Sequence, residues 1–203
     1  FYALLSLGLA VIFGLLKIIN FAHGAMYMLG AMTTVLMFDY LGVNYWVALL
    51  LAPLLVGAFG VAIEYFLLRR IAGQDHIYSL LLTFGVALII SGVLVNWFGV
   101  SGLRYTMPDM FKGGVNLGFM FMPYYRAWVI VAALVVCFAT WFVIEKTKLG
   151  AYLRAGTENP KIVEAFGVNV PLMVTLTYGF GVALAAFAGV LAAPVIQVSP
   201  LMG

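Results

Sequence analysis

Long apolar runs separated by short polar stretches make up most of this chain of 203 residues. Six apolar segments can be counted, at 1–16, 24–38, 45–68, 77–98, 127–144 and 172–196. The last four contain 24, 22, 18 and 25 residues, near the roughly 20 that a helix needs to cross a bilayer. They are also much longer than the strands of a membrane β-barrel, which have about 10 residues. The pattern predicts an all-α, polytopic transmembrane helical bundle that forms a single domain over 1–203.

The polar stretch at 17–23 interrupts the first two segments, which contain 16 and 15 residues. As helices these would be about 24 and 22 Å long, and neither comfortably crosses a hydrocarbon core of about 30 Å. The stretch holds Lys17, Asn20 and His23, and such groups are costly at membrane depth unless they face protein or water. Two interpretations stay open: a cytoplasmic turn, or a broken or re-entrant segment inside the membrane.

Short, interrupted apolar segments are a sequence signal for a translocation site. We therefore take as candidates for the translocation pathway Asn20, Phe21, His23, Gly24, Tyr27 and Gly30. A second interpretation is structural, because the His23 ring and the Asn20 amide can also satisfy backbone groups freed by the break. Lys17 is expected to cap the break or to extend its amine toward the membrane surface.

Loop charges indicate the orientation. Loops 69–76 and 145–171 together carry six Lys and Arg residues, whereas loop 99–126 between them carries three and an acid. The positive-inside rule therefore places 69–76 and 145–171 in the cytoplasm. Aromatic residues at the ends of the apolar runs are expected to form interfacial belts: Tyr45, Trp46, Trp97, Tyr124, Tyr125 and Trp128.

Composition agrees with a membrane protein and limits the chemistry. Charged residues make up 8% of the chain and mean hydropathy is +1.15, against about 25% charged residues in soluble domains. The net charge of +3 is too small and too dispersed to indicate nucleic-acid binding, and one cysteine provides no disulfide or thiolate metal site. No nucleotide-binding or hydrolase motif is present. We expect no enzyme activity, no metal and no cofactor.

The positions of the seven acidic residues bear on ion coupling. All lie in loops or at the ends of helices, and Glu64 is expected to be an interfacial charge. A carrier driven by protons or sodium ions would be expected to place an acid in mid-span. This distribution argues against a secondary transporter.

Small residues recur every four positions in segment 172–196, at Gly181, Ala185, Gly189 and Ala193. Such a ridge allows another helix to approach closely in lipid. We favour a contact within the chain over an interface between subunits.

Loop 145–171 contains the signals of a short helix. Asn159 and Pro160 form an N-cap and first-turn pair, and Gly167 is a stop signal. The helix between them, with Ile162, Val163 and Phe166 on one face, is too short to be stable alone. It must dock on the protein itself, on the membrane interface or in the groove of a partner.

Two motifs carry a resemblance to the permeases of branched-chain amino acid ABC transporters, and the resemblance extends over essentially all 203 residues. The first is Ile18-Ile-Asn-Phe-Ala-His-Gly-Ala-Met-Tyr-Met-Leu-Gly30. The second is the cytoplasmic loop pattern formed by Gly150, Arg154, Ala155, Gly167, Val168 and Asn169. Val163 departs from the alanine usual in this family.

The resemblance implies a non-enzymatic, multi-pass permease subunit of a bacterial inner membrane, taken here as part of a longer chain. Its implied partners are cytoplasmic ATPase subunits, a second homologous permease and a periplasmic substrate-binding protein. The loop that contacts the ATPase would include Gly150, Arg154, Ala155, Glu158, Ile162, Val163, Phe166, Gly167 and Asn169. Branched-chain amino acids are the expected substrates. Urea or short amides, a stand-alone channel and an ion-coupled carrier are the alternatives.

Overall fold

The computed structural model describes residues 1–116, 118 and 121–203. The α-helices in that part of the chain are α1 Tyr2–Leu16, α2 His23–Leu41, α3 Tyr45–Phe66, α4 His76–Phe98, α5 Tyr124–Lys146, α6 Lys148–Glu158, α7 Pro160–Ala165 and α8 Val170–Ala192. Two short 3-10 helices, η1 Leu68–Ile71 and η2 Asp109–Phe111, and a hairpin of β1 Gly114–Asn116 with β2 Phe121–Pro123 complete it. The predicted all-α bundle is confirmed. Among the described residues, four helices are long and apolar enough to cross a membrane: α3, α4, α5 and α8.

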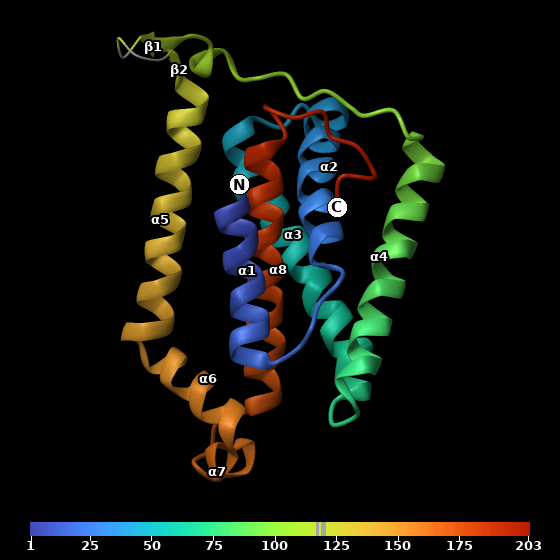
Figure 1. Ribbon diagram of the computed structural model, residues 1–203, viewed down its shortest axis with the longest axis vertical. Coiled ribbons are helices and arrows are strands. Elements are labelled where there is room, and N and C mark those ends of the chain that lie inside the picture. Colours follow the sequence, from blue (N-terminus) through green and yellow to red (C-terminus); the bar gives the residue numbers. More distant parts are fainter. Residues whose placement is uncertain (117, 119–120) are drawn as a thin grey trace.

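Helix α8 lies at the centre of the bundle, although it follows all the other described helices in these 203 residues. It packs against α1, α2 and α3, as Figure 1 shows with α8 in red. In its most apolar stretch 72% of the residues are buried within the chain, against 17% in α4 and in α5. These two helices flank the bundle on opposite sides. Most of their surface is therefore free to face lipid or another membrane protein.

Close contacts between helix backbones hold α8 in place. A Cβ atom at Gly30 would lie 2.2 Å from the carbonyl oxygen of Ala186, and one at Gly189 would lie 2.0 Å from that of Tyr27. A Cβ atom at Gly181 would lie 2.5 Å from the side chain of Ile12. The small-residue ridge of α8 therefore faces α1 and α2 within the same chain, because only positions without a side chain allow this approach.

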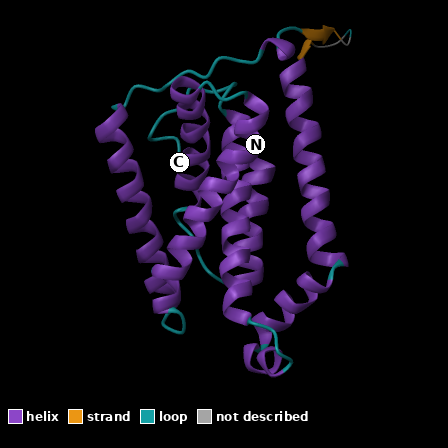
Figure 2. Cartoon of the chain, turned by 180° about the vertical axis from the view of Figure 1, so that it is seen from behind, coloured by secondary structure: helices purple, strands orange, loops and turns teal. Residues whose placement is uncertain are grey.

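The two ends of the bundle carry different loops. The end of α1, the turn around η1 and helices α6 and α7 lie at the lower end in Figure 1, and the loop after α4 and the hairpin lie at the upper end. Seen from behind in Figure 2, the hairpin precedes the upper end of α5. Loops 69–76 and 145–171 thus share one end, as the loop charges predict, and this is the end expected in the cytoplasm.

A buried aromatic group joins α3, α5 and α8 at the upper end. The Trp128 indole donates a hydrogen bond to the Tyr45 hydroxyl (3.2 Å), which lies 3.0 Å from the Tyr125 hydroxyl, and Tyr125 donates to the carbonyl of Leu191 (2.8 Å). Nearby, in the loop after α4, burial raises the pKa of Tyr105 to about 12. The expectation that Tyr45 and Tyr125 belong to an interfacial belt is therefore wrong, because both are fully covered by neighbouring helices. Trp97 remains exposed, as a belt residue would.

Glu64 also departs from its expected place. It is only 3% exposed, and its carboxylate accepts a hydrogen bond from the Thr175 hydroxyl of α8. The position two residues before the end of α3 suggested an interfacial charge. However, α8 packs along α3 and covers this last turn, so the carboxylate lies between two helices.

Candidate functional site

The stretch 17–22 is not helical: residues 17–20 have no regular secondary structure and 21–22 form a turn, and together they lead back into the bundle. Helix α1 ends at Leu16, the left-handed backbone of Lys17 after it (φ 55°) turns the chain, and the following linker rises to the start of α2 (Figure 1). The His23 ring donates from Nε2 to the carbonyl of Leu5 at 2.9 Å. Leu5 lies 11 residues before Leu16, or about 17 Å along the helix axis. The geometry therefore favours the broken segment over the cytoplasmic turn.

Polar side chains accept hydrogen bonds from backbone amides of this break, which have no helical partners. The Asn20 side-chain oxygen accepts from the amide of Ala22 (3.0 Å), and the Thr83 hydroxyl of α4 accepts from the amide of Phe21 (3.1 Å). Asn20 is 4% exposed, His23 5% and Thr83 0%. This arrangement fits the rule that irregular backbone at membrane depth needs partners within the protein. Thr83 was not among the sequence candidates, and its only signal is a hydroxyl within an apolar run.

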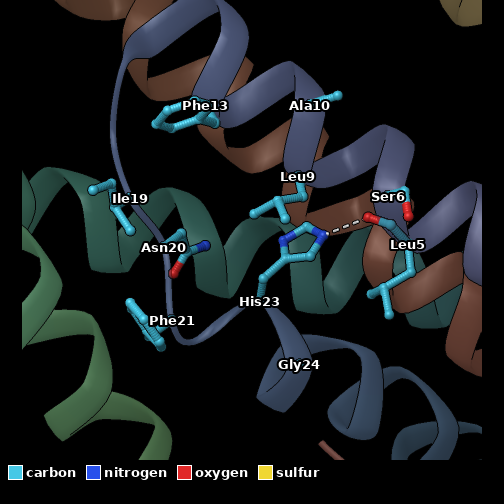
Figure 3. Close-up of a pocket in the computed structure, with 10 residues that line it drawn as sticks. All are labelled: Leu5, Ser6, Leu9, Ala10, Phe13, Ile19, Asn20, Phe21, His23 and Gly24. Atoms are coloured by element: carbon cyan, nitrogen blue, oxygen red, sulfur yellow. Dashed lines mark hydrogen bonds between the residues drawn. The ribbon is translucent and has the colours of Figure 1, made fainter.

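An open cavity of about 580 Å³ lies between α1 and the break. Figure 3 shows the residues that line it: Leu5, Ser6, Leu9, Ala10, Phe13, Ile19, Asn20, Phe21, His23 and Gly24. Four of the six pathway candidates are thus brought together on one wall. The cavity is apolar apart from the Ser6 hydroxyl, the Asn20 amide and the His23 ring. It is large enough for a small organic solute, since ligand sites range from about 300 to 1,000 Å³.

Tyr27 and Gly30, the other two pathway candidates, lie elsewhere on α2. Gly30 faces α8, where it permits the backbone contact with Ala186. The carbonyl of Tyr27 faces Gly189 of α8, and its half-buried side chain is not part of the cavity wall. The geometry gives both positions a role in helix packing.

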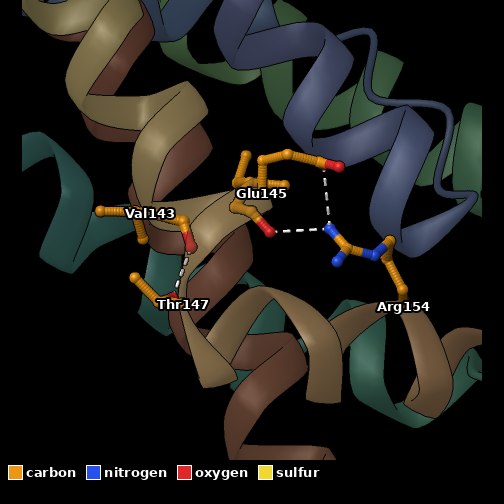
Figure 4. Close-up of polar contacts among 5 residues, drawn as sticks. Val143, Glu145, Thr147 and Arg154 are labelled. Carbon is orange, nitrogen blue, oxygen red and sulfur yellow. Dashed lines mark hydrogen bonds and ion pairs between the residues drawn. The ribbon is translucent and has the colours of Figure 1, made fainter.

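Loop 145–171 contains a second helix, α6, that the sequence analysis did not identify. Arg154 of α6 donates to the carbonyl of Ile144 at 2.7 Å and lies 3.3 Å from the carboxylate of Glu145, as Figure 4 shows. Arg154 therefore caps the end of α5. A Cβ atom at Gly150 would lie 1.7 Å from the same Ile144 carbonyl, so glycine allows α6 to fold back against α5.

Helix α7 has the predicted boundaries, but its apolar residues are divided. Asn159 caps its start through the amide of Ile162 (3.4 Å), and Gly167 follows its end with φ 81°. Val163 is buried against the chain (6% exposed), whereas Ile162 is 55% and Phe166 82% exposed. The expectation of one shared apolar face is therefore wrong. Helix α7 has only six residues. Its Val163 side chain packs against the rest of the chain, and the side chains of Ile162 and Phe166 stay exposed.

The remaining loop candidates fall into two groups. Ala155 and Glu158 are exposed on α6, and Asn169 caps α8 through the amide of Leu172 (3.0 Å). Thr157, which the sequence analysis missed, donates to the carbonyl of Leu15 at 2.6 Å. This bond attaches α6 to the end of α1, two residues before the break begins.

Comparison with known proteins places these features in context. The chain matches, over residues 1–203, the family described as branched-chain amino acid transport system / permease component. It is 27% identical over 203 residues to the high-affinity branched-chain amino acid transport system permease protein BraD of Pseudomonas aeruginosa. It is 26% identical over 205 residues to the permease protein LivH of the corresponding system of Escherichia coli.

Each of these alignments covers 94% of this chain but only 66% and 65% of BraD and LivH, just under two thirds of their lengths. A third relative, the permease protein LivM of Escherichia coli, is 27% identical over 214 residues, which is 49% of its length. No solved structure matches the chain.

Proposed function

Because this chain belongs to the family of branched-chain amino acid transport permeases, we propose that it forms the membrane-spanning pathway of a bacterial ABC importer for branched-chain amino acids. ATP is hydrolysed by separate cytoplasmic subunits. A second permease of the same family and a periplasmic binding protein complete the assembly in the inner membrane. Relatives named LivH and LivM occur together in one organism, which supports a pair of homologous permeases.

The observation that carries this proposal is the polar break beside an open cavity at membrane depth. His23 meets Leu5 far from the end of α1, and Asn20, Phe21 and His23 line a space of about 580 Å³. Polar groups are retained at such depth chiefly where they line a route for a solute. A non-helical segment can also change conformation with less disruption than a continuous helix, because it has few internal hydrogen bonds.

The cytoplasmic end provides a surface for an ATPase. Ile162 of α7 and Phe166, which directly follows α7, project from the chain without cover. Helix α6 is fixed to α5 by Arg154 and to the end of α1 by Thr157. A partner that moves α7 therefore acts on α1 close to the point where the break begins.

One observation favours a second candidate, an ion-coupled carrier. Glu64 is buried between α3 and α8, and buried carboxylates are the groups that ion-coupled carriers use. Its hydroxyl partner on Thr175 gives it an equally good structural role. Transport measurements on the permease with and without the ATPase distinguish the importer from the ion-coupled carrier.

The full-length permease is reconstituted in liposomes with a second permease, the ATPase and the binding protein, and in a parallel sample without the ATPase. We expect leucine uptake only with the ATPase and ATP, and we expect Glu64→Gln to retain most of it. The exposed Asp39→Asn serves as the control. Uptake by the permease alone, driven by an ion gradient and lost in Glu64→Gln, would establish the carrier and refute the importer.

A further inference from the structure

Two buried nitrogen atoms beside the cavity lack a partner. His23 Nδ1 and Asn20 Nδ2 make no hydrogen bond with any described residue, although each atom is covered and each residue is at least 95% buried. Figure 3 shows the free edge of the His23 ring and the Asn20 amide turned toward one another beside the cavity. Unsatisfied buried polar atoms cost free energy and are rare in folded proteins. Two of them on one cavity wall therefore indicate a ligand.

The hydrogen bonds that these side chains do make determine whether each free nitrogen is a donor or an acceptor. The Leu5 carbonyl can only accept, so Nε2 of His23 carries a proton, and Nδ1 of the neutral ring is an acceptor. The Asn20 oxygen accepts from the amide of Ala22, so Nδ2 keeps both of its hydrogens for donation. The two side chains beside the cavity thus hold one free acceptor and one free donor, both covered in this structure.

The surrounding surface limits the ligand further. None of the ten lining residues, all in the described part of the chain, is an Asp, Glu, Lys or Arg. A solute with a net charge would find no counter-ion there, and its desolvation would be costly, whereas the two opposite charges of a zwitterion lie close together and compensate each other. Leu5, Leu9 and Phe13 of α1 provide apolar lining. The cavity therefore suits an aliphatic solute whose polar head carries a donor and an acceptor but no net charge.

We infer that His23 Nδ1 and Asn20 Nδ2 form the head-group site for a zwitterionic aliphatic amino acid. The α-ammonium donates to His23 Nδ1, the carboxylate accepts from Asn20 Nδ2, and the side chain lies against α1. This inference rests on the proposed function. Because both nitrogens are covered, the solute reaches them when the cavity widens during the transport cycle. Because the site offers one acceptor and one donor, a solute must carry both an ammonium and a carboxylate to bind well, and an aliphatic tail alone is not sufficient.

The test measures whether solutes protect a cysteine in the cavity of the complete, reconstituted complex. Cys137 is first replaced by alanine, and Ser6, an exposed residue of the cavity wall, by cysteine. Labelling by a small aqueous thiol reagent is followed with leucine, 4-methylpentanoate or 3-methylbutylamine. The last two compounds keep the tail but carry only the carboxylate or only the amine. We expect leucine to slow labelling and the two half compounds to require at least tenfold higher concentrations.

Two substitutions of His23 and Asn20 separate head-group binding from a structural role. His23→Gln can keep a nitrogen that donates to Leu5 but has no acceptor at the place of Nδ1, and Asn20→Leu removes the donor. We expect each to raise the leucine concentration needed for protection at least tenfold. Thr34→Val is the matched control, because Thr34 is buried on the same helix and bonds only to the Gly30 carbonyl among described residues.

The possible outcomes are distinct. If both half compounds protect as well as leucine, or if His23→Gln behaves like Thr34→Val, the head-group site is refuted. If leucine does not protect the cavity while the complex still takes up leucine with ATP, the site is refuted and the proposed function stands. Leucine could also slow labelling of the Ser6→Cys variant in a complex that takes up no leucine. That result would support the head-group site and contradict the transport proposal.

Discussion

Single positions without side chains decide how closely the helices of this bundle approach. At Gly189 a Cβ atom would lie 2.0 Å from the carbonyl oxygen of Tyr27 and 2.9 Å from the amide nitrogen of Ala31. Both are backbone atoms of α2, so a neighbouring side chain cannot move aside to relieve the clash. We expect Gly189→Val to lower stability by about 1–3 kcal/mol or to prevent assembly of the bundle.

Thermal unfolding of the purified protein in detergent measures this effect. Gly85→Val on α4 is the control, because no atom outside its own helix lies within 4 Å of a Cβ there. Equal melting temperatures for the two variants would contradict the close α2–α8 contact.

Residues near helix ends show where sequence reasoning was insufficient. Glu64 and Tyr45 lie at opposite ends of α3, and both were assigned to the membrane interface from that position. Both are buried, since α8 covers one and the aromatic group at the start of α5 covers the other. Position along a span predicts depth, but not which neighbouring helix covers the residue. That information lies in contacts between segments more than 60 residues apart.

At the scale of elements, α7 divides into one residue that stabilises the chain and two that are available to a partner. Phe166 is 82% exposed, so Phe166→Ala should not change the melting temperature. Burying its ring in a partner's groove would contribute about 1.5–3 kcal/mol. We therefore expect the variant to weaken ATPase association about tenfold or more.

Co-purification of the ATPase with permease variants at matched expression measures this association. Val163→Ala is the matched control, because Val163 is buried within the chain (6% exposed). It should lower the melting temperature and weaken binding less. If Phe166→Ala retains the ATPase and its full stimulated hydrolysis, α7 is not the coupling element.

Elements with strong local signals could be predicted, and those that depend on distant contacts could not. The apolar runs gave the long helices, and Asn159, Pro160 and Gly167 gave both ends of α7. Helix α6 was not predicted because its sequence mixes apolar and polar residues and contains no long apolar run. Its position depends on hydrogen bonds to Ile144 and Leu15, which belong to other helices. For the break, polarity predicted the cavity wall at Asn20 and His23, but not the contribution of Thr83.

At the scale of the whole molecule, α4 is joined to the bundle at the break. The Thr83 hydroxyl accepts from the amide of Phe21, and the Phe21 and Phe84 rings meet edge to face at 6.4 Å. Few other contacts hold α4, since only three of its residues are buried. A displacement of α4 therefore acts directly on the break.

Thr83→Val removes this connection at nearly constant volume. It leaves the Phe21 amide unpaired, at a cost of about 1–3 kcal/mol, so we expect slower transport and faster labelling of a cysteine at position 21. Thr83→Ser keeps the hydroxyl and should restore both rates, measured in liposomes at equal protein content. Unchanged labelling in Thr83→Val would show that the break is held in place without α4.

The central place of α8 also has a consequence for biosynthesis. The surfaces of α1 and α2 that α8 covers emerge from the ribosome long before it does, since Ala192 follows Leu41 by about 150 residues. At about 5–20 residues per second, that interval lasts roughly 8–30 s. During this time the early helices reside in the membrane with their glycine-lined grooves open to lipid or to insertion factors. The nascent chain is then exposed to mispairing and to quality-control proteases until α8 arrives.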